Sequence, residues 1–410
     1  MQATRVVITG LGPVTSLGYG QQACWEALIA GRSGISPVDA FDTSGYTVNL
    51  GGQIKEFDPQ TIVPDQVPPE LGRTAQLGLT AALLAIRDSG LEADAFRGGR
   101  SGIAMGTTSG EPLEIERLDD CWVAGKHERI DPQFVDRYPC HSIPLAMGRE
   151  LGISGPVAML PTACAAGNYA IAWAYEQIRK GRVQRMLAGG ADSFSRITYS
   201  GFAQLQAIAS EKCQPFDKNR KGMIPGEGAA VLVLESLDQA LERSAKIYCE
   251  VIGYGLSCDA YHITGAHPEG DGARRAMARA LRDSGLGLED IGYISAHGTG
   301  TPGNDHKETL ALKALFGEQA YRIAISSVKS MLGHTMGAAS AIEATVCALA
   351  LTDSKAPPTI NYETPDPECD LDYIPNEARD IELEYAMNTA YAFGGNNSAV
   401  VFKAWKGASG

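Results

Sequence analysis

The sequence predicts an α/β protein with largely buried sheets, and two patterns carry that prediction. Short runs rich in Val, Ile and Leu recur along the 410 residues, among them RVVITG, SGIAMG, RMLAGGAD, AAVLVLES, EVIGYGLS, IGYISAHG, RIAISSVKS and SAVVFKAW. Alanine-rich segments with helical spacing separate several of these runs, at residues 74–89, 168–180, 272–284 and 337–352. Strands that alternate with helices in this way are typical of sheets covered by helices.

The length of the chain predicts two or three closely associated subdomains, because 410 residues exceed the usual size of one compact core. Two segments share a pattern of strand, small-residue turn and apolar helix. PVAMLPTACAAGNYAIAWAYEQI carries Cys164 in its turn, and RIAISSVKSMLGHTMGAASAIEATVCALAL carries His334. We therefore predict two related halves, residues 1–250 and 251–410. The alternative is that two unrelated strand–helix units merely look alike.

Charge and composition exclude several classes of protein. The net charge of −13 argues against non-specific nucleic-acid binding, which needs a clustered positive surface. We expect no membrane span, since no run of 18 apolar residues occurs, and the N-terminal sequence lacks the features of a signal peptide. The nine cysteines are odd in number and form no CxxC pair. This usage predicts reduced thiols in a cytoplasmic protein.

The stretch PTACAAG places Cys164 between two apolar runs, with small residues on both sides. A helix that begins just after it would direct unpaired N–H groups and a partial positive charge at the sulfur. That setting predicts a lowered thiol pKa and a nucleophilic thiolate. The competing interpretation is a buried cysteine that acts as a small hydrophobic residue.

Two of the seven histidines lie in glycine-rich turns that follow strands. His297 is in SAHGTGTPGND and His334 is in KSMLGHTMGA, positions from which side chains project into a cleft. A cysteine with two such histidines is suited to nucleophilic catalysis. Zinc binding is the competing use. However, the two histidines have no clear carboxylate partner and Cys164 would be the only thiolate ligand, so we expect no metal.

Two glycine-rich stretches do not predict a nucleotide site. GTGTPGND is not followed by Gly-Lys-Ser/Thr, and the glycines of TGLGPVTSLG, after the strand RVVITG, do not give GxGxxG.

Lys329 ends the apolar run IAISSV, where we expect it to pair with a buried carboxylate such as Glu308.

An ordered set of motifs resembles one family over nearly the whole chain. The set comprises RVVITGLGPVTSLG, GRSGISPVDAFD, TACAAG, AGGAD, PFDKNRKGMIPGEGAAVLVLE, SAHGTGTPGNDHKE, SSVKSMLGHTMGAASAIEA, PPTIN, CDLDYIPNEAR and AYAFGGNNSAVVF. In these motifs the chain resembles the β-ketoacyl-[acyl-carrier-protein] synthases, specifically the elongating type II enzymes of bacterial fatty acid synthesis and their relatives in type II polyketide systems. The resemblance implies the thiolase fold, two related halves in a five-layered α-β-α-β-α body that is usually a dimer.

The resemblance also implies a reaction. Cys164 is similar to the nucleophile that accepts an acyl chain from a carrier-protein thioester, and His297 and His334 to the pair that supports decarboxylation of malonyl-carrier protein. No cofactor is implied. The implied partner is an acyl carrier protein, which delivers acyl and malonyl thioesters.

Three further roles follow from the resemblance alone. Lys329 and Glu308 match the lysine and glutamate that organise the site by an ion pair. Phe393, in AFGG, is similar to the gating phenylalanine beside the nucleophile. The backbone N–H groups of Cys164 and Phe393 would then form the oxyanion hole.

The chain departs from the family pattern where a carrier protein would dock. Gln206 stands where relatives often have an arginine, and VPDQVPPELGRTAQ keeps only Arg73 where relatives carry several basic residues. Lys126 and Arg129 remain as docking candidates. The two alanines after Cys164 replace a pair that often contains a hydroxyl residue. We therefore expect the partner to be a specialised carrier protein rather than the housekeeping one.

Three functions compete. The first is an elongating synthase of fatty acid or polyketide synthesis, acting as a homodimer. The second is an active subunit that works only as a heterodimer with a non-catalytic chain-length factor; the chain itself is not such a factor, because those proteins have lost the cysteine. A degradative thiolase uses the same fold with two cysteines and coenzyme A, but HGTGTP and GHTMGA favour the carrier-protein branch.

Overall fold

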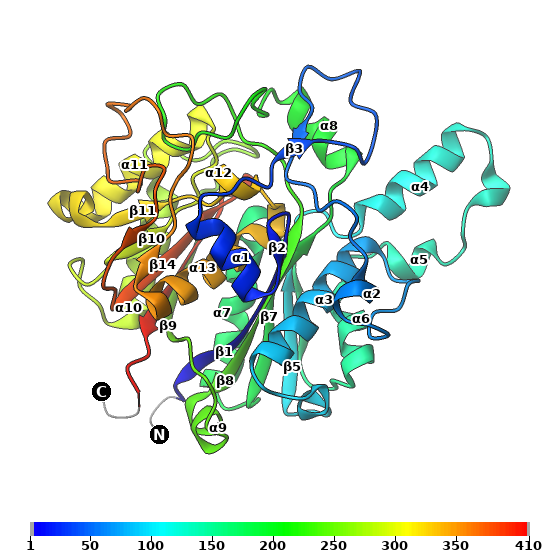
Figure 1. The fold of residues 1–410 in the computed structure, drawn as a ribbon, viewed down its shortest axis with the longest axis horizontal. Coiled ribbons are helices and arrows are strands. Elements are labelled where there is room, and N and C mark those ends of the chain that lie inside the picture. The colour runs from blue at the N-terminus through cyan, green and yellow to red at the C-terminus, as the bar shows by residue number, and fades with distance from the viewer. Residues whose placement is uncertain (1–3, 408–410) are drawn as a thin grey trace.

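The computed structural model describes residues 4–407, and most of its strands belong to one continuous mixed sheet (Figure 1). The strands of this sheet are β1 (Val6–Thr15), β2 (Gly18–Tyr19), β5 (Ser101–Gly106), β6 (Val157–Leu160), β7 (Arg185–Asp192), β8 (Gly228–Ser236), β9 (Cys249–Cys258), β10 (Tyr293–Ser295), β11 (Ala324–Ser326), β14 (Tyr385–Tyr391) and β15 (Asn396–Ala404). Their order is β11-β10-β14-β15-β9-β1-β8-β7-β5-β6, with β2 beside β1.

The two ends of this sheet have the same topology. In the first half β6, β5 and β7 are parallel, and β8 and β1 follow antiparallel. In the second half β11, β10 and β14 are parallel, and β15 and β9 follow antiparallel. Antiparallel pairing of β1 with β9 joins the halves. This repetition confirms the prediction of two related halves. The expected boundary at residue 250 falls at the second residue of β9, and the boundary itself stays a prediction.

Helices cover both outer faces of the sheet and fill the space between its halves, which gives five layers (Figure 1). The covering helices are α3 (Arg73–Asp88) and α6 (Ser142–Leu151) in the first half, and α10 (Asp271–Ser284) and α11 (Pro302–Phe316) in the second. The central helices are α7 (Ala166–Arg179) and α13 (Ala339–Asp353). The three largest apolar clusters of the described chain correspond to the central layer and the two outer interfaces. This arrangement confirms the expected five-layered α/β fold.

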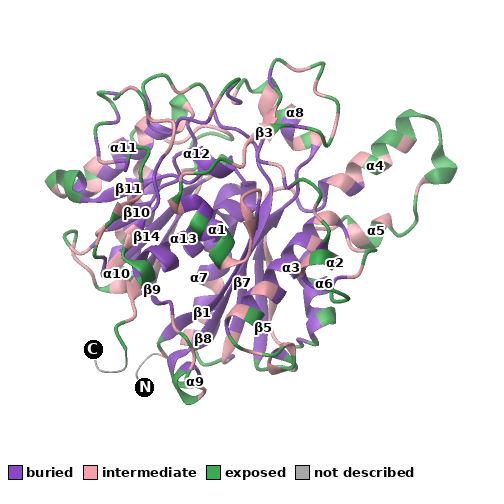
Figure 2. Ribbon diagram, in the orientation of Figure 1, coloured by how far each residue is buried: buried purple, intermediate pink, exposed green. Residues whose placement is uncertain are grey.

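The central helix α13 is buried on every side from Ala339 to Leu351, and most of its ribbon has the buried colour in Figure 2. Together with the preceding turn it gives one segment, Met336–Asp353, that is long and apolar enough to cross a membrane. However, 89% of that segment is buried inside the protein. A helix that is apolar all round is expected in the core of a large protein, so α13 is a core helix.

The glycine-rich stretch after RVVITG lies within a strand, because β1 continues to Thr15. A Cβ atom on Gly12 would lie 2.0 Å from the carbonyl oxygen of Ala81 in α3, so only glycine allows this helix to approach the strand. In the second half, a Cβ on Gly255 would lie 2.0 Å from the carbonyl oxygen of Ala276 in α10. The glycines of β1 and β9 therefore serve the packing of equivalent helices.

Shorter elements complete the chain. They are α1 (Gln21–Ile29), β3 (Ser36–Pro37), β4 (Leu50–Gly51), α2 (Pro59–Ile62), α4 (Pro112–Val123), α5 (Phe134–Arg137), α8 (Arg196–Gln204), α9 (Leu237–Glu242), α12 (Lys329–Leu332), β12 (Lys355–Ala356) and β13 (Arg379–Asp380). Four short 3₁₀ turns matter below: η2 (His127–Arg129), η3 (Ala163–Ala165), η5 (Met336–Ala338) and η6 (Phe393–Gly395). All nine cysteines are free thiols.

Candidate active site

Two equivalent turns, one from each half, start the central helices. Cys164 lies in η3, directly before α7, and His334 lies just before η5, which leads into α13. The first residue of each turn has a left-handed backbone conformation, with φ of 53° at both Ala163 and Met336. By this correspondence Gly337, rather than His334, is the counterpart of Cys164. The duplication therefore brings two helix N-termini to one place.

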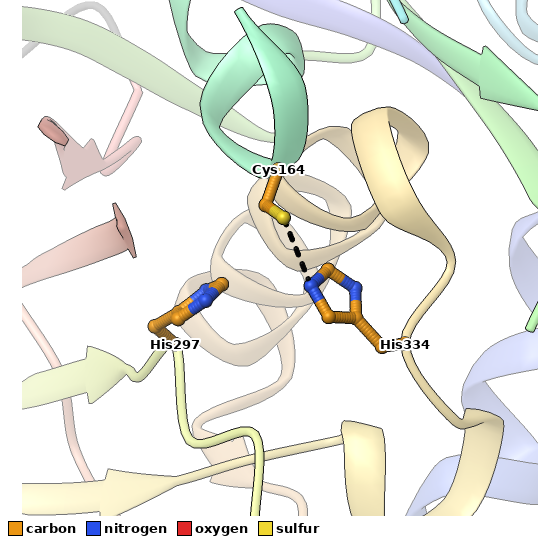
Figure 3. Close-up of side chains that lie close together, drawn as sticks. All are labelled: Cys164, His297 and His334. Atoms are coloured by element: carbon orange, nitrogen blue, oxygen red, sulfur yellow. Dashed lines mark hydrogen bonds between the residues drawn. The ribbon is translucent and has the colours of Figure 1, made fainter. Parts of the chain in front are cut away.

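The structure brings Cys164, His297 and His334 together, as the sequence analysis predicts (Figure 3). His334 Nε2 lies 3.1 Å from Cys164 Sγ. His297 follows β10, and its ring centroid is 5.5 Å from that of His334. The sulfur and one nitrogen of each ring all lie within 4.8 Å of one another. All three side chains are buried and line a pocket of about 210 Å³.

Both imidazoles are neutral N–H donors. Burial lowers the pKa of His297 and of His334 well below the usual value, and the nearby Lys329 cation lowers both further. The backbone N–H of Met336 donates to His334 Nδ1 at 3.2 Å. Since Nδ1 accepts, the proton of neutral His334 is on Nε2, which faces the sulfur. In the described chain His297 Nδ1 is buried without a hydrogen-bond partner.

The expected low pKa of the Cys164 thiol is wrong. Burial raises the pKa of Cys164 to about 12, and the Asp192 charge adds to this effect. The Lys329 cation acts in the opposite direction but does not compensate for the loss of water. A helix N-terminus alone would favour the thiolate, but the protein removes nearly all solvent from the sulfur.

This raised pKa predicts how the thiol responds to pH. Only the thiolate reacts with iodoacetamide, so the alkylation rate of Cys164 should rise about tenfold per pH unit from pH 7 to pH 9 without a plateau. The measurement is mass spectrometry of the Cys164 peptide after timed labelling. The Cys164→Ala variant gives the background from the other thiols. A plateau below pH 8 would show that the thiolate is already the resting form.

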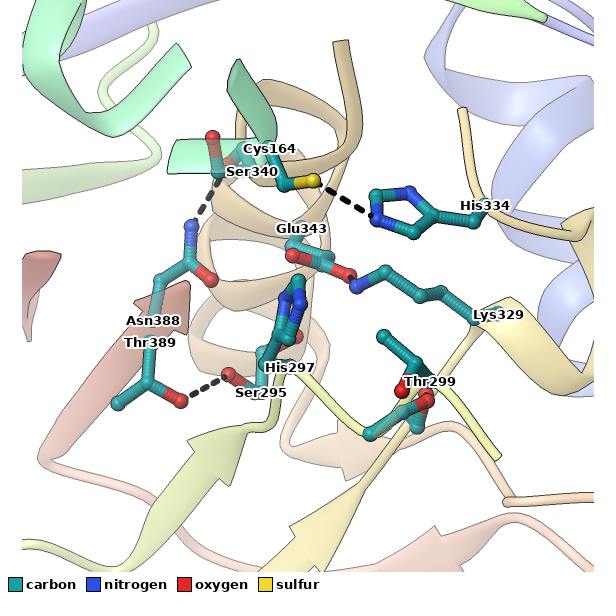
Figure 4. Close-up of polar contacts among 12 residues, drawn as sticks. Cys164, Ser295, His297, Thr299, Lys329, His334, Ser340, Glu343, Asn388 and Thr389 are labelled. Atoms are coloured by element: carbon teal, nitrogen blue, oxygen red, sulfur yellow. Dashed lines mark hydrogen bonds and ion pairs between the residues drawn. The ribbon is translucent and has the colours of Figure 1, made fainter. Parts of the chain in front are cut away.

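Lys329 pairs with Glu343, which corrects the expected pair with Glu308 (Figure 4). Both side chains of the observed pair are almost fully buried, Lys329 on α12 and Glu343 on the second turn of α13. Burial raises the pKa of Glu343 to about 7, and Lys329 opposes that shift. The pair places a cation beside Cys164 and the two histidines.

Glu308 positions the His297 loop instead. Its carboxylate accepts the backbone N–H groups of His297 and Gly298, each at 2.8 Å, and the side-chain amide of Asn304 at 3.1 Å. Burial raises the pKa of Glu308 to about 7, while the hydrogen bonds lower it. Glu308 therefore fixes the backbone that carries one of the two imidazoles.

Phe393 lies at the mouth of the same pocket, where the family resemblance places a gate. It belongs to η6, is 39% exposed, and its ring centroid is 5.7 Å from that of Phe202 in α8. The other lining residues come from four regions: Ala207 and Met223, Thr264–Ala266, Thr299–Lys307, and Tyr391–Asn397.

The three docking candidates have different environments. Arg73 is three-quarters buried and forms an ion pair with the fully buried Glu227 at 2.9 Å, so it is unsuited to surface docking. Sequence reasoning could not distinguish this buried cation from an exposed one. Lys126 and Arg129 are exposed at the tip of the arm formed by α4 and η2. That arm projects from the side of the molecule opposite α11, which lines the pocket (Figure 1).

The three central residues also provide the ligand types that zinc prefers. Two features make this a poor cation site. The thiol resists ionisation, and the Lys329 cation acts on all three groups. The geometry favours an anionic reacting group between the imidazoles.

Two residues of the site were missed by the sequence analysis. Glu343 is the sole charged residue of the apolar helix segment AASAIEATVCALAL. A single carboxylate in such a segment indicates a buried group with a cationic partner, so Glu343 could have been identified from the sequence. Asp192 ends the strand RMLAGGAD and is fully buried behind η5. Nothing in its local sequence distinguishes it from an acid at the end of a surface strand.

Comparison with known proteins identifies the family. The sequence model "Beta-ketoacyl synthase, N-terminal domain" matches residues 3–240, and "Beta-ketoacyl synthase, C-terminal domain" matches residues 248–363. The chain belongs to the β-ketoacyl synthase family. Among the relatives of this synthase, proteins named 3-oxoacyl-[acyl-carrier-protein] synthase 2 from Synechocystis and Coxiella burnetii are each 39% identical, over 98–99% of the chain and 99% of the relative.

Solved structures place this synthase in the thiolase fold. It is similar to the ishigamide ketosynthase/chain length factor, with a TM-score of 0.94 and 40% identity over 98% of this chain and all of that one. It is also similar to a type II polyketide ketosynthase in complex with its acyl-carrier protein and bound to a hexaketide, with a TM-score of 0.90 and 33% identity over 99% of this chain and all of that one.

Proposed function

We propose that this synthase catalyses decarboxylative Claisen condensation of an acyl group, held on Cys164, with malonyl-[acyl-carrier-protein]. The product is a 3-oxoacyl-[acyl-carrier-protein], two carbons longer. The observation that carries the proposal is one thiol beside two neutral imidazole donors in a buried pocket. The names of the relatives support the same reaction.

The first step transfers an acyl group. Thiolate is the reactive form, and the His334 Nε2–H, the Lys329 cation and the N-terminus of α7 all favour it over the thiol. The sulfur attacks the thioester carbonyl, the bond to the carrier sulfur breaks, and the carrier leaves as a thiol with the proton that Cys164 lost. We assign stabilisation of the tetrahedral oxyanion to the backbone N–H groups of Cys164 and Phe393.

The second step uses the histidines. Malonyl-carrier protein loses CO₂, and negative charge develops on the thioester oxygen of the resulting enolate. Neutral N–H donors from His297 and His334 can stabilise this oxygen without a proton transfer to solvent. The enolate carbon then attacks the acyl group on Cys164, and the released thiolate takes up one proton. A buried pocket protects the acyl-enzyme from hydrolysis.

Delivery of substrates requires an acyl carrier protein. Lys126 and Arg129 are the remaining basic candidates for its docking. Because their arm projects from the side of the molecule opposite α11, and α11 contributes residues to the pocket, we assign them to the pocket of a second subunit. A cytoplasmic location fits the free thiols.

A dimer is supported by an open sheet edge next to the nucleophile. Within residues 4–407, β6 pairs with β5 on one side only and leads directly into the Cys164 turn. The opposite edge is covered, since the N–H of Ile325 in β11 donates to the carbonyl of Asp372. Unpaired edges favour pairing with another chain.

The second candidate function is that of an active subunit that requires a chain-length-factor homologue on this edge. The similarity to the ishigamide ketosynthase/chain length factor favours it.

The experiment that tests the proposal is a condensation assay with acyl- and malonyl-carrier thioesters. Mass spectrometry should show a 3-oxoacyl-carrier product and equimolar CO₂. Product from the purified chain alone supports the homodimer. Product that appears only with a co-purifying homologue supports the heterodimer. Failure under both conditions would contradict the condensation chemistry.

A further inference from the structure

A buried carboxylate that the proposed reaction does not use lies behind the η5 turn. Asp192 ends β7 and is 1% exposed. It accepts four hydrogen bonds, from the hydroxyl of Thr107 at 2.9 Å and from the backbone N–H groups of Thr108 at 2.8 Å, Ser109 at 2.8 Å and Gly337 at 2.6 Å. Three donors come from the loop after β5 in the first half, and the fourth comes from η5 in the second half.

The contact between η5 and the first half is too close for a side chain at Gly337. A Cβ atom on Gly337 would lie 2.6 Å from Asp192 Oδ2 and equally close to the backbone of Thr107. A Cβ on Gly190, two residues before Asp192 in β7, would lie 2.5 Å from the carbonyl oxygen of Gly337. Glycine is therefore needed on both sides, and the first half of the protein determines where η5 sits.

The position of η5 sets the orientation of the His334 imidazole. The N–H of Met336, the residue before Gly337, donates to His334 Nδ1, and the same ring presents Nε2 to Cys164 at 3.1 Å. We propose that Asp192 is a positioning residue that holds η5 through the Gly337 N–H and thereby aims His334 at the reacting group. Asp192 does not line the pocket, so it acts through the histidine. This inference rests on the proposed role of His334 in decarboxylation.

The carboxylate is specifically suited to this task. No ion pair holds Asp192 among residues 4–407, so its charge is balanced by N–H and O–H donors alone. Both oxygens of a carboxylate accept hydrogen bonds, whereas the amide of asparagine presents one oxygen and an NH₂ group that donates. Asparagine at this position would turn one acceptor into a donor that faces other donors.

The test is the Asp192→Asn variant in an assay of CO₂ release from malonyl-carrier protein. We expect kcat to fall about 10- to 100-fold, because small displacements of a catalytic group have effects of this size. KM should change by less than about threefold, since Asp192 does not line the pocket. Glu235→Gln is the matched control. Glu235 lies in β8 beside the opposite end of β7, is also fully buried, and forms ion pairs with Arg185 and Arg243. Its loss should lower stability but not kcat.

A second measurement separates positioning from general structural support. If Asp192 acts through His334, the Asp192→Asn change in a His334→Ala background should lower CO₂ release by less than about twofold. The reason is that the effects of substitutions at two residues that act together are not additive. An equal loss in both backgrounds would overturn the assignment. Thr107→Val, which removes one of the four donors, should give a smaller loss in the same step and keeps the test decisive if Asp192→Asn does not fold. A wild-type chain without CO₂ release would overturn the proposed function itself, whereas normal release by Asp192→Asn overturns only the Asp192 assignment.

Discussion

Replacement of Cys164 by glutamine should abolish condensation and preserve decarboxylation of malonyl-carrier protein. Condensation needs the sulfur to hold the acyl group, and removal of a nucleophile typically lowers the rate by about 10³-fold or more. Decarboxylation depends on His297 and His334, whose contacts to Glu308 and Met336 do not involve the cysteine. The measurement is parallel determination of 3-oxoacyl product and CO₂ from the same reaction.

The matched control is Cys24→Ala, which removes another buried cysteine outside the pocket. Burial raises the pKa of Cys24 to about 11, so it resembles Cys164 in environment but does not line the pocket. Both reactions should proceed normally in this variant. Loss of CO₂ release together with condensation in Cys164→Gln would show that the cysteine and the histidines do not have separate roles.

Replacement of Lys329 by methionine should destabilise the protein by about 3–5 kcal/mol, because it leaves the buried Glu343 carboxylate without its cation. Removal of both charges in Lys329→Met/Glu343→Leu should recover most of that loss, since a buried ion pair can be replaced by apolar groups. Urea unfolding followed by circular dichroism measures both effects. The comparator is Lys329→Met/Glu308→Gln, which should recover little, as Glu308 bonds to backbone N–H groups instead.

The same variants report on the thiol. The Lys329 cation lowers the pKa of Cys164, so its loss raises that pKa and reduces the thiolate fraction at a given pH. Alkylation of Cys164 at pH 9 should therefore slow in the single variant. It should slow less in the Glu343→Leu double variant, because the Glu343 charge raises the pKa of Cys164 and is removed as well. Equal alkylation rates in wild type and variants would show that this cation does not influence the sulfur.

The duplicated architecture and the Cys–His–His cluster could be predicted because their signals are local. Strand, small-residue turn and apolar helix occur twice in the sequence, and the two turns meet because the halves have the same topology. β14 was missed for an equally local reason. Its sequence YAMNTAY contains Asn388 and Thr389, which interrupt the apolar pattern. Both side chains are buried and donate hydrogen bonds, Asn388 to the carbonyl of Ser340 and Thr389 to the carbonyl of Ser295.

Properties that depend on three-dimensional neighbours could not be predicted. Lys329 has two buried carboxylates in its vicinity, Glu308 and Glu343, and the direction of α12 decides between them. The thiol pKa depends on how much water the fold excludes, which a helix N-terminus in the sequence does not reveal. Arg73 looked like a surface cation because its partner Glu227 lies 154 residues away.

The most direct test of the central claim is identification of the acylated residue. The purified chain is incubated with an acyl-carrier thioester, quenched, digested and mapped by mass spectrometry, and a second sample is chased with malonyl-carrier protein before the quench. The proposed mechanism predicts an acyl adduct on Cys164 that disappears in the chase as 3-oxoacyl-carrier product forms. An adduct on another of the nine cysteines, or one on Cys164 that malonyl-carrier protein does not release, would contradict it.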